Sequence, residues 1–505
     1  MNSMSVFSIS IKNNLSLMKL NIKKISITAM LFTLLSGTLM AQIGKPFIHD
    51  PSTIMESDGK YYTFGTRGGG LISEDGWTWN GGAVRPGGGA APDAMKIGDR
   101  YLIVYGVTGG GLGGGHDGKI MTMWNKTLDP NSPDFKYTEP VLVAESKNME
   151  DNDAIDPGLL LDPTTGRLWM SYGTYFGNIR LVELDPKTGK RVEGNEAIDI
   201  AIDCEATDLE YRNGWYYLLG THGTCCDSAN STYNIVVGRS KNVTGPYIDN
   251  MGRDMLKGGG KMVISSGGGR TNGAGHFGRT ILGEGVEKVS FHWEADLDQG
   301  GHSVLAIKPL LWDKGWPEAG ENLKDGTYEI ESERRGYGLE LVIDFVRMPR
   351  ASKRFFFNHE DNDEPIESVL SQKLSDVIDT WPSGNIDVRA GDYIARPHQR
   401  WTITQVTDAS GFFGTPAYKI VIEGTDRALA ATADAEVLTV PEFTGAPEQL
   451  WRIDQLIDGT YRIMPKKVPN SNKEYALVSI GDSTPTLAEF DFNSDNSKWN
   501  FKDKE

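Results

Sequence analysis

Short apolar and aromatic segments, each introduced by a turn, recur along the first two thirds of the chain. The copies are DGKYYTFGT (58–66), GDRYLIVYGV (98–107), TGRLWMSYGT (165–174), RNGWYYLLGT (212–221) and a weaker EKVSFHWEAD (287–296). Each alternates or runs apolar over roughly six to eight residues, which is typical of a β-strand. Because no long helical pattern separates them, they predict an all-β fold in which five copies form a five-bladed β-propeller over residues 42–320. A β-sandwich with similar hairpins is the alternative.

A different repeat follows the GWP segment at residues 315–317. Three tryptophans, Trp401, Trp451 and Trp499, close QRW, QLW and SKW, and strand starts precede them at 325–330, 417–422 and 458–463. The first copy is longer, which predicts an insertion within 333–390. This three-fold pattern resembles the ricin-type β-trefoil lectins, whose repeats end in Gln-x-Trp, although Ser497 replaces the Gln of the third copy. The resemblance implies a β-trefoil over residues 321–505 that either binds carbohydrate or serves as a spacer.

Composition narrows the class of protein. The chain has 505 residues with 51 basic and 68 acidic side chains, a formal net charge of −17. Such a charge disfavours binding to nucleic acid or to anionic membrane surfaces, since both need a basic face. Glycine is abundant at 60 residues, which fits many strands joined by tight turns.

The N-terminus predicts export. Lys19, Lys23 and Lys24 precede an apolar run from Ile25 to Met40, and the small residue Ala41 follows. This is the pattern of a secretory signal peptide over residues 1–41, and the run is shorter than the ~20 residues of a membrane-spanning helix. We expect an exported protein, in the periplasm, at the cell surface or extracellular, without a membrane span and monomeric.

Only three cysteines occur, at positions 204, 225 and 226. They are too few for a disulfide scaffold and form no zinc-type CxxC pair. One disulfide and one thiol, or buried free thiols throughout, remain equally compatible with the sequence.

Three acidic residues precede predicted inner strands of different blades. Asp50 lies in IHDPS, Asp156 in AIDPG and Glu205 in DCEAT. Inner strands line the central channel of a propeller, so acids at the same point of successive blades would converge at one mouth. Convergent carboxylates, one protonated and one ionised, are what glycoside hydrolysis needs.

Longer strings connect these acids to a known family. The segments AIDPGLLLDPTTGRLWMSYGTYFGNIRLVELD (154–185) and CEATDLEYRNGWYYLLGTHGTCCDSANSTYNIVVGRSKNVTGPY (204–247) resemble family 43 glycoside hydrolases, especially the arabinanase branch with endo-1,5-α-L-arabinanase activity. The resemblance covers about residues 43–317 and implies a five-bladed propeller that hydrolyses with inversion. It implies that Asp50 is the general base, Glu205 the general acid, and Asp156 the residue that tunes the pKa of the acid. Thr207 stands where the family commonly has proline.

The same resemblance implies a metal. His276, in NGAGHFG (272–278), matches a histidine that faces a metal ion, usually calcium, in the channel of arabinanases. Because calcium prefers oxygen ligands, one histidine with several waters would be an unusual site. A hydrogen-bonded structural histidine is the alternative.

Substrate contacts depart from the family pattern. The common Trp-Ala-Pro-Asp is replaced by AAPD at residues 90–93, which keeps Asp93 as a candidate substrate-binding residue but removes an aromatic platform. Trp77, Trp79 or Tyr175 are candidates to replace the platform, with packing between blades as the alternative. The glycine-rich loop 106–118 could bring His116 to the substrate.

The sequence therefore predicts a secreted glycoside hydrolase that cleaves α-1,5-linked arabinan. The alternatives are an exo-acting α-L-arabinofuranosidase or β-xylosidase, and a non-catalytic carbohydrate-binding protein. The expected partner is a polysaccharide, arabinan or a related arabinofuranosyl or xylosyl glycan, and the expected cofactor is calcium.

Overall fold

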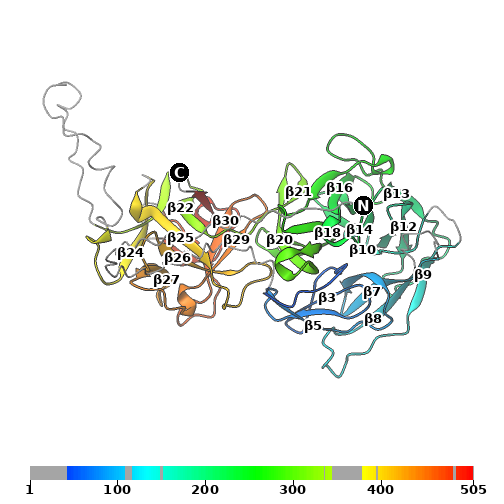
Figure 1. Ribbon diagram of the computed structural model, residues 1–505, viewed down its shortest axis with the longest axis horizontal. Coiled ribbons are helices and arrows are strands. Elements are labelled where there is room, and N and C mark those ends of the chain that lie inside the picture. Colours follow the sequence, from blue (N-terminus) through cyan, green and yellow to red (C-terminus); the bar gives the residue numbers. More distant parts are fainter. Residues whose placement is uncertain are drawn as a thin grey trace, which may run out of the picture. The chain divides into compact units, whose positions relative to one another are not determined.

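The computed structural model describes residues 43–108, 117–147, 152–334, 336–343, 378–393, 396–480 and 485–503. Over these ranges the chain folds into strands and a few single 3-10 turns, which confirms the all-β prediction (Figure 1). No helix in these ranges is long and apolar enough to span a membrane. The predicted signal peptide and His116 lie outside the described residues.

In the described residues the first domain is a ring of five sheets, each built on four consecutive antiparallel strands, with one further parallel strand in the first sheet. Blade 1 contains β2 (Met55–Ser57), β3 (Lys60–Phe64), β4 (Gly70–Ser73) and β5 (Thr78–Ala83); blade 2 contains β6 (Ala90–Ile97), β7 (Arg100–Thr108), β8 (Lys119–Asn125) and β9 (Val141–Glu145). Blade 3 contains β10 (Gly158–Leu161), β11 (Leu168–Tyr172), β12 (Asn178–Leu184) and β13 (Ile198–Ile202). Blade 4 contains β14 (Glu205–Arg212), β15 (Trp215–His222), β16 (Asn234–Ser240) and β17 (Lys261–Ile264), with the turns η1 (Ser228–Asn230) and η2 (Met255–Lys257). Blade 5 contains β18 (Thr271–Gly283), β19 (Val286–Asp296), β20 (His302–Asp313) and β21 (Trp316–Ala319), with η3 (Leu297–Gln299). Five blades are as predicted, and each repeat of the sequence forms the second strand of its blade.

Apolar side chains pack between neighbouring blades all the way round the ring. Each of five buried clusters contains residues of two neighbouring blades, for example Tyr62 and Tyr105, Val104 and Met170, Leu181 and Leu218, Val237 and Phe291, and Trp79 and Leu305. Because both faces of each sheet are covered in this way, the strands read as almost continuous apolar runs.

The N-terminal segment closes the ring between the last and first blades. β1 (Ile43–Gly44) pairs in parallel with β5, and Leu305 of β20 donates its N–H to the carbonyl of Pro46 at 2.8 Å. The N–H of Ile48 is donated in turn to the carbonyl of Ser303, at 3.2 Å. The two residues that follow Ile48, His49 and Asp50, are thereby held at the seam between blades 1 and 5.

Each blade has a non-glycine residue with a positive φ within its first strand or in the segment just before it. These residues are Asp50 (51°), Ala91 (41°), Asp156 (51°), Ala206 (46°) and His276 (63°). The ladders of blades 2, 4 and 5 are irregular at the same places, between Ala90 and Asp93, Glu205 and Asp208, and Gly275 and Gly278. A left-handed backbone conformation costs conformational free energy for L-residues, and such residues are common at functional sites. Here it occurs at Asp50, Asp156 and His276, and at Ala206 next to Glu205.

The second domain contains a ten-stranded sheet and a separate hairpin. Its strands are β22 (Gly326–Ser332), β23 (Tyr337–Leu341), β24 (Ile386–Asp392), β25 (Arg400–Gln405), β26 (Ala417–Ile422), β27 (Ala428–Ala431), β28 (Val437–Val440), β29 (Trp451–Gln455), β30 (Tyr461–Pro465), β31 (Ala476–Val478), β32 (Thr486–Ala488) and β33 (Trp499–Asp503). The turns η5 (Pro397–Gln399), η6 (Pro447–Gln449) and η7 (Asp495–Ser497) each precede one of the three repeat tryptophans.

The three repeat tryptophans occupy equivalent core positions. All are fully buried, and their indole N–H groups are donated to the carbonyls of Leu339, Leu429 and Leu477, over chain separations of 62, 22 and 22 residues. The longer first separation agrees with an insertion in the first repeat, whose residues 344–377 lie outside the described ranges. This repeated core is consistent with the predicted β-trefoil.

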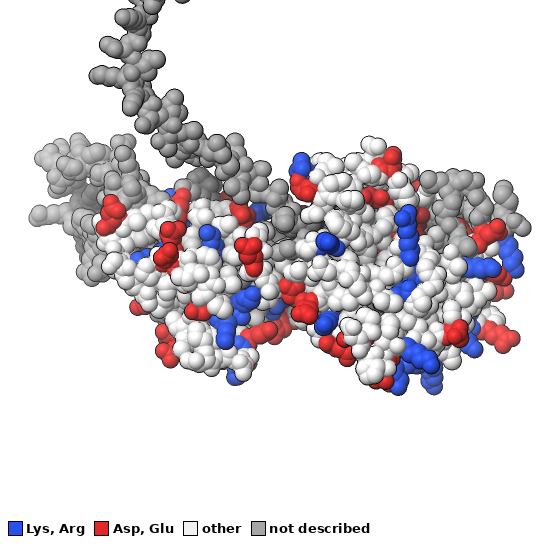
Figure 2. Space-filling view, turned by 60° about the horizontal axis from the view of Figure 1, so that its bottom comes forward, with Lys and Arg blue, Asp and Glu red and all other residues white. Residues whose placement is uncertain are grey.

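Charge is spread over the surface. On the face shown in Figure 2, acidic and basic side chains are intermixed, without a continuous basic area.

Candidate active site

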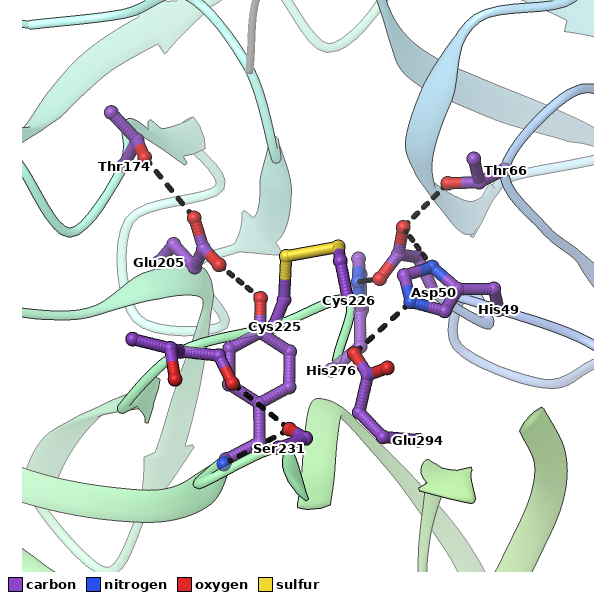
Figure 3. Close-up of a disulfide and its surroundings, with 12 residues drawn as sticks. His49, Asp50, Thr66, Thr174, Glu205, Cys225, Cys226, Ser231, His276 and Glu294 are labelled. Atoms are coloured by element: carbon purple, nitrogen blue, oxygen red, sulfur yellow. Dashed lines mark hydrogen bonds and ion pairs between the residues drawn. A yellow bond between two sulfur atoms is a disulfide. The ribbon is translucent and has the colours of Figure 1, made fainter. Parts of the chain in front are cut away.

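The three acidic residues singled out in the sequence come together at one end of the channel. Asp50 enters from blade 1, Asp156 from blade 3 and Glu205 from the first position of β14 in blade 4. Their charges interact, since both Glu205 and Asp50 raise the pKa of Asp156 in addition to its burial. Figure 3 shows Asp50 and Glu205 on opposite sides of this region.

Asp50 is surrounded by hydrogen-bond donors and imidazoles. Its Oδ2 accepts a hydrogen bond of 2.5 Å from the Thr66 hydroxyl and lies 2.8 Å from Nδ1 of His49. Its Oδ1 lies 3.9 Å from Nδ1 of His276. Burial alone would raise the pKa of Asp50, but the charge on His49, with His276 and His292 nearby, holds that pKa well below its usual value. Asp50 is therefore an ionised carboxylate, as a general base must be.

Glu205 is buried and accepts hydrogen bonds from two hydroxyl groups. It is 7% exposed, its Oε2 accepts a hydrogen bond of 3.1 Å from the Thr174 hydroxyl, and its Oε1 accepts one from the Tyr233 hydroxyl. Burial, with a further contribution from the charge of Asp50, raises the pKa of Glu205 to about 7, although both hydroxyl contacts oppose the shift. Glu205 thus keeps a proton near neutral pH, as a general acid must.

Asp156 forms a coupled pair with Glu205. It is 9% exposed, and its pKa is raised well above the usual value by burial and then by the charges of Glu205 and Asp50. Two buried carboxyls that repel each other cannot both ionise easily, so the pair retains one proton to higher pH than either group would alone.

His276 presents an unsatisfied nitrogen to the same region. The residue is 5% exposed, and its backbone N–H is donated to the Thr221 hydroxyl at 3.0 Å. Its Nδ1 is buried and makes no hydrogen bond with any residue in the described ranges. A buried, unpartnered nitrogen beside a carboxylate fits a position that binds a metal ion or an ordered water.

Of the substrate-binding candidates, the structure brings only Tyr175 toward the acids. Tyr175 is partly exposed and lies near enough to Glu205 for that carboxyl to raise the pKa of its phenol, after burial. Trp77 is 2% exposed, so its indole has no free face for a sugar. His116 lies outside the described residues.

Asp93 has a structural explanation in place of the expected substrate contact. It is 4% exposed, and its two carboxylate oxygens accept backbone N–H groups from Thr53 of blade 1, at 3.2 Å, and Leu159 of blade 3, at 3.0 Å. The side chain thus ties the inner segments of three blades together. The position of Asp93 in the sequence could not by itself distinguish this structural role from a substrate contact.

Several residues at the site were not singled out from the sequence. His49 contacts Asp50 directly, Tyr233 donates to Glu205, and Glu294 accepts from His49 at 3.1 Å. The position of His49, next to the predicted base, was the one available signal. Tyr233 lies 28 positions from Glu205 within the same blade, whereas Glu294 lies 245 positions from His49 and is brought to it by the closing of the ring.

The cysteines form one disulfide, between the neighbouring residues Cys225 and Cys226, and leave Cys204 as a buried thiol. Of the two open alternatives, the structure therefore has the bridge. The disulfide lies in the segment between β15 and β16, which also carries Tyr233, and Figure 3 shows it in the same view as Glu205 and Asp50.

Comparison with known proteins agrees with this geometry. The family model described as glycosyl hydrolases family 43 matches residues 41–317. The chain is 34% identical over 252 residues to the extracellular exo-α-(1→5)-L-arabinofuranosidase ArbA of Cellvibrio japonicus, covering 46% of this chain and 71% of that protein. It is 32% identical over 231 residues to the extracellular endo-α-(1→5)-L-arabinanase 1 of Bacillus subtilis, covering 45% and 67%. The crystal structure of an exo-1,5-α-L-arabinanase from a bovine ruminal metagenomic library is similar with a TM-score of 0.50 at 31% identity, covering 55% of this chain and 99% of that one. With a match over more than half of its length, this chain belongs to glycosyl hydrolase family 43.

Proposed function

We propose that this glycoside hydrolase cleaves α-1,5-L-arabinofuranosidic bonds in arabinan with inversion of configuration. The observation that carries the proposal is the contrast between two carboxyls at one mouth, an ionised Asp50 and a protonated Glu205. The relatives named above are an exo-α-(1→5)-L-arabinofuranosidase and an endo-α-(1→5)-L-arabinanase, which supports the choice of substrate.

In the proposed reaction, a water lies between Asp50 and the anomeric carbon. Oδ2 of Asp50 is already engaged by Thr66 and His49, so Oδ1 is the atom that accepts the proton of the water. Glu205 gives its proton to the departing glycosidic oxygen as that bond breaks. Attack on the face opposite the leaving group inverts the anomeric centre, and no covalent sugar intermediate forms.

Asp156 acts on the acid in this scheme. Its coupling to Glu205 keeps a proton on the pair, and proximity holds that proton where the leaving oxygen needs it. Thr174 and Tyr233 fix the orientation of the Glu205 carboxyl.

We further propose that calcium binds at His276, because its buried Nδ1 has no hydrogen-bond partner among the described residues. A bound cation would supply positive potential to the neighbouring carboxylates. Treatment with EDTA followed by calcium addition tests this, and activity unchanged by both steps would show that the metal is irrelevant to turnover.

The mode of cleavage is the open part of the proposal, since the two relatives include an exo-acting and an endo-acting protein. A polysaccharide panel with product sizing and NMR of the first-formed anomer is the deciding experiment. Oligomers from arabinan in the first minutes support the endo mode. Arabinose alone supports an exo-acting arabinofuranosidase, xylose from xylo-oligosaccharides supports a β-xylosidase, and a retained anomer contradicts inversion. Binding without any release of reducing sugar would favour a carbohydrate-binding protein.

The proposal extends to export and to the second domain. Both relatives are named extracellular, which supports a secreted protein. The second domain is proposed to tether the enzyme to polysaccharide and raise its local concentration. Because the three repeat tryptophans are fully buried, they belong to the core and any sugar site lies elsewhere on that domain.

A further inference from the structure

Glu294 is a buried acid that the reaction described above does not use. It lies on β19 of blade 5, with a side chain 3% exposed, and its Oε1 faces two imidazoles. Nε2 of His49 lies 3.1 Å from this oxygen and Nε2 of His292 lies 3.4 Å from it. Figure 3 shows the ring of His49 between Asp50 and Glu294.

The backbone of Asp50 determines where His292 carries its proton. The Asp50 N–H is donated to Nδ1 of His292 at 3.2 Å, so Nδ1 offers a lone pair. His292 is fully buried, and burial together with the nearby charge of His49 lowers its pKa, which leaves it neutral. A neutral imidazole has one N–H, and that proton must be on Nε2, from which it is donated to Glu294.

His49 carries two protons for a related reason. Its Nδ1 faces Oδ2 of Asp50 and its Nε2 faces Oε1 of Glu294, so both nitrogens meet carboxylates. Burial opposes a charge on His49, yet Asp50 and Glu294 together raise its pKa to about 11. The rings of His49 and His292 also stack, with centroids 4.5 Å apart.

These proton positions argue against a metal in the same cluster. One ligand atom from each of His49, His292 and Glu294 lies within 4.8 Å of the others, a spacing compatible with a metal ion. A metal would need lone pairs on both Nε2 atoms. The Asp50 N–H keeps the proton on Nε2 of His292, and the two carboxylates keep His49 protonated.

We propose that Glu294 is a positioning residue for the base, holding His49 so that His49 fixes the carboxylate of Asp50 toward the water. This rests on the proposed function of Asp50. With Oδ2 bound by His49 and Thr66, the carboxylate cannot rotate, and Oδ1 keeps one direction. Glu294 anchors the far side of His49, and through His292 it also orients the Asp50 backbone, whose φ of 51° is strained.

The test compares Glu294→Gln with Glu294→Asp and a control on the same strand. Glu294→Gln keeps the volume and removes the charge, so kcat should fall about 20-fold with KM within about twofold. Glu294→Asp keeps the charge on a shorter side chain and should retain more activity. A merely structural role predicts the reverse order, because Asp leaves a gap where Gln does not.

The control is Asp296→Asn. Asp296 lies two residues after Glu294 at the end of β19, is 3% exposed, and its carboxylate accepts a backbone N–H from Asp298 at 2.8 Å. It makes no contact with His49 or His292 in the described residues, so its kcat should match the parent protein. Thermal unfolding of every variant establishes that each is folded.

Two further measurements show that the effect passes through the base. If Glu294→Gln impairs only the base, kcat should fall equally on a substrate with a good leaving group and on the polymer. If it also impairs Glu205, kcat should fall more on the polymer. In a His49→Gln background, Glu294→Gln should add almost nothing, since the two residues act in one chain of contacts. A full additional 20-fold loss in that background overturns the inference.

Asp50→Asn, measured alongside, distinguishes a failure of the proposed function from a failure of the proposed role of Glu294. If Asp50→Asn retains parent activity, the proposed function itself is wrong. If Asp50→Asn is inactive and Glu294→Gln has parent kcat, the proposed function stands and the role of Glu294 is refuted.

Discussion

The two sides of the channel mouth each present a carboxyl side chain, but they hold it in opposite protonation states. On the side formed by blades 1 and 5, Asp50 is surrounded by three histidines and a hydroxyl. On the side formed by blades 3 and 4, Glu205 has a second carboxyl and two hydroxyls as neighbours. The cationic His49 keeps one carboxyl ionised, and burial beside another carboxyl keeps the other protonated.

The difference in pKa between Asp50 and Asp156 comes from the neighbouring side chains, since the backbone conformation is the same at both acids. Asp50 and Asp156 have the same φ of 51°, yet the pKa of Asp50 is lowered and that of Asp156 is raised. The propeller repeats a strained inner-strand position in each blade, and the side chains contributed by adjacent blades then decide which acid titrates where.

Removing the ionised side should have the largest effect. Asp50→Asn is expected to lower kcat about 10⁴-fold, because the amide cannot accept the proton of the attacking water. The loss should be similar for arabinan and for an arabino-oligosaccharide with a nitrophenyl leaving group, measured by steady-state kinetics. Parent activity in this variant would remove Asp50 from the base role.

Removing the protonated side should depend on the leaving group. Glu205→Gln is expected to lower kcat on arabinan about 10³-fold while binding to arabinan is retained, since only proton donation is lost. A nitrophenyl leaving group departs without protonation, so its loss should be under about tenfold. Equal losses on both substrates would contradict the acid assignment.

Asp156→Asn should weaken the coupling and shift the pH profile. We expect a kcat loss of about 10²-fold on arabinan. Without the second carboxyl, Glu205 should lose its proton at a lower pH than the coupled pair loses its last proton, because the repulsion within the pair is gone. Activity that declines through about pH 7 in the parent protein should therefore decline at a lower pH in the variant. If the activity of the variant declines at the same pH as that of the parent protein, Asp156 does not tune the pKa of the acid.

Tyr233→Phe should shift the decline of activity at high pH in the opposite direction, toward higher pH. Of the variants considered, it should have the smallest effect on kcat. The Tyr233 hydroxyl donates to Glu205 and favours its ionised form, so its removal should raise the pKa of Glu205 and extend activity to higher pH. A kcat change of about fivefold is expected at the optimum. A shift toward lower pH would contradict this arrangement of donors.

The fold was predictable because its signal is repeated. Five copies of one strand pattern predicted five blades, and three Gln-x-Trp-like tryptophans predicted a repeated core whose indoles make the same hydrogen bond three times. The candidate acids were found because short motifs precede the inner strands. Trp77 and Asp93 show the limit of that reasoning, because an aromatic or acidic residue near the right motif can equally be buried between blades.

The amino-acid sequence by itself determined the strand repeat, the family resemblance and the three carboxyl side chains, since each depends on residues that are near neighbours in the chain. Only the tertiary structure decided which carboxyl is ionised, because that depends on side chains hundreds of residues away: Glu294 lies 245 positions from the His49 it contacts, and His292 lies 242 from Asp50. Closing the ring brings the first and last blades together, and the electrostatic field at the mouth exists only after that closure.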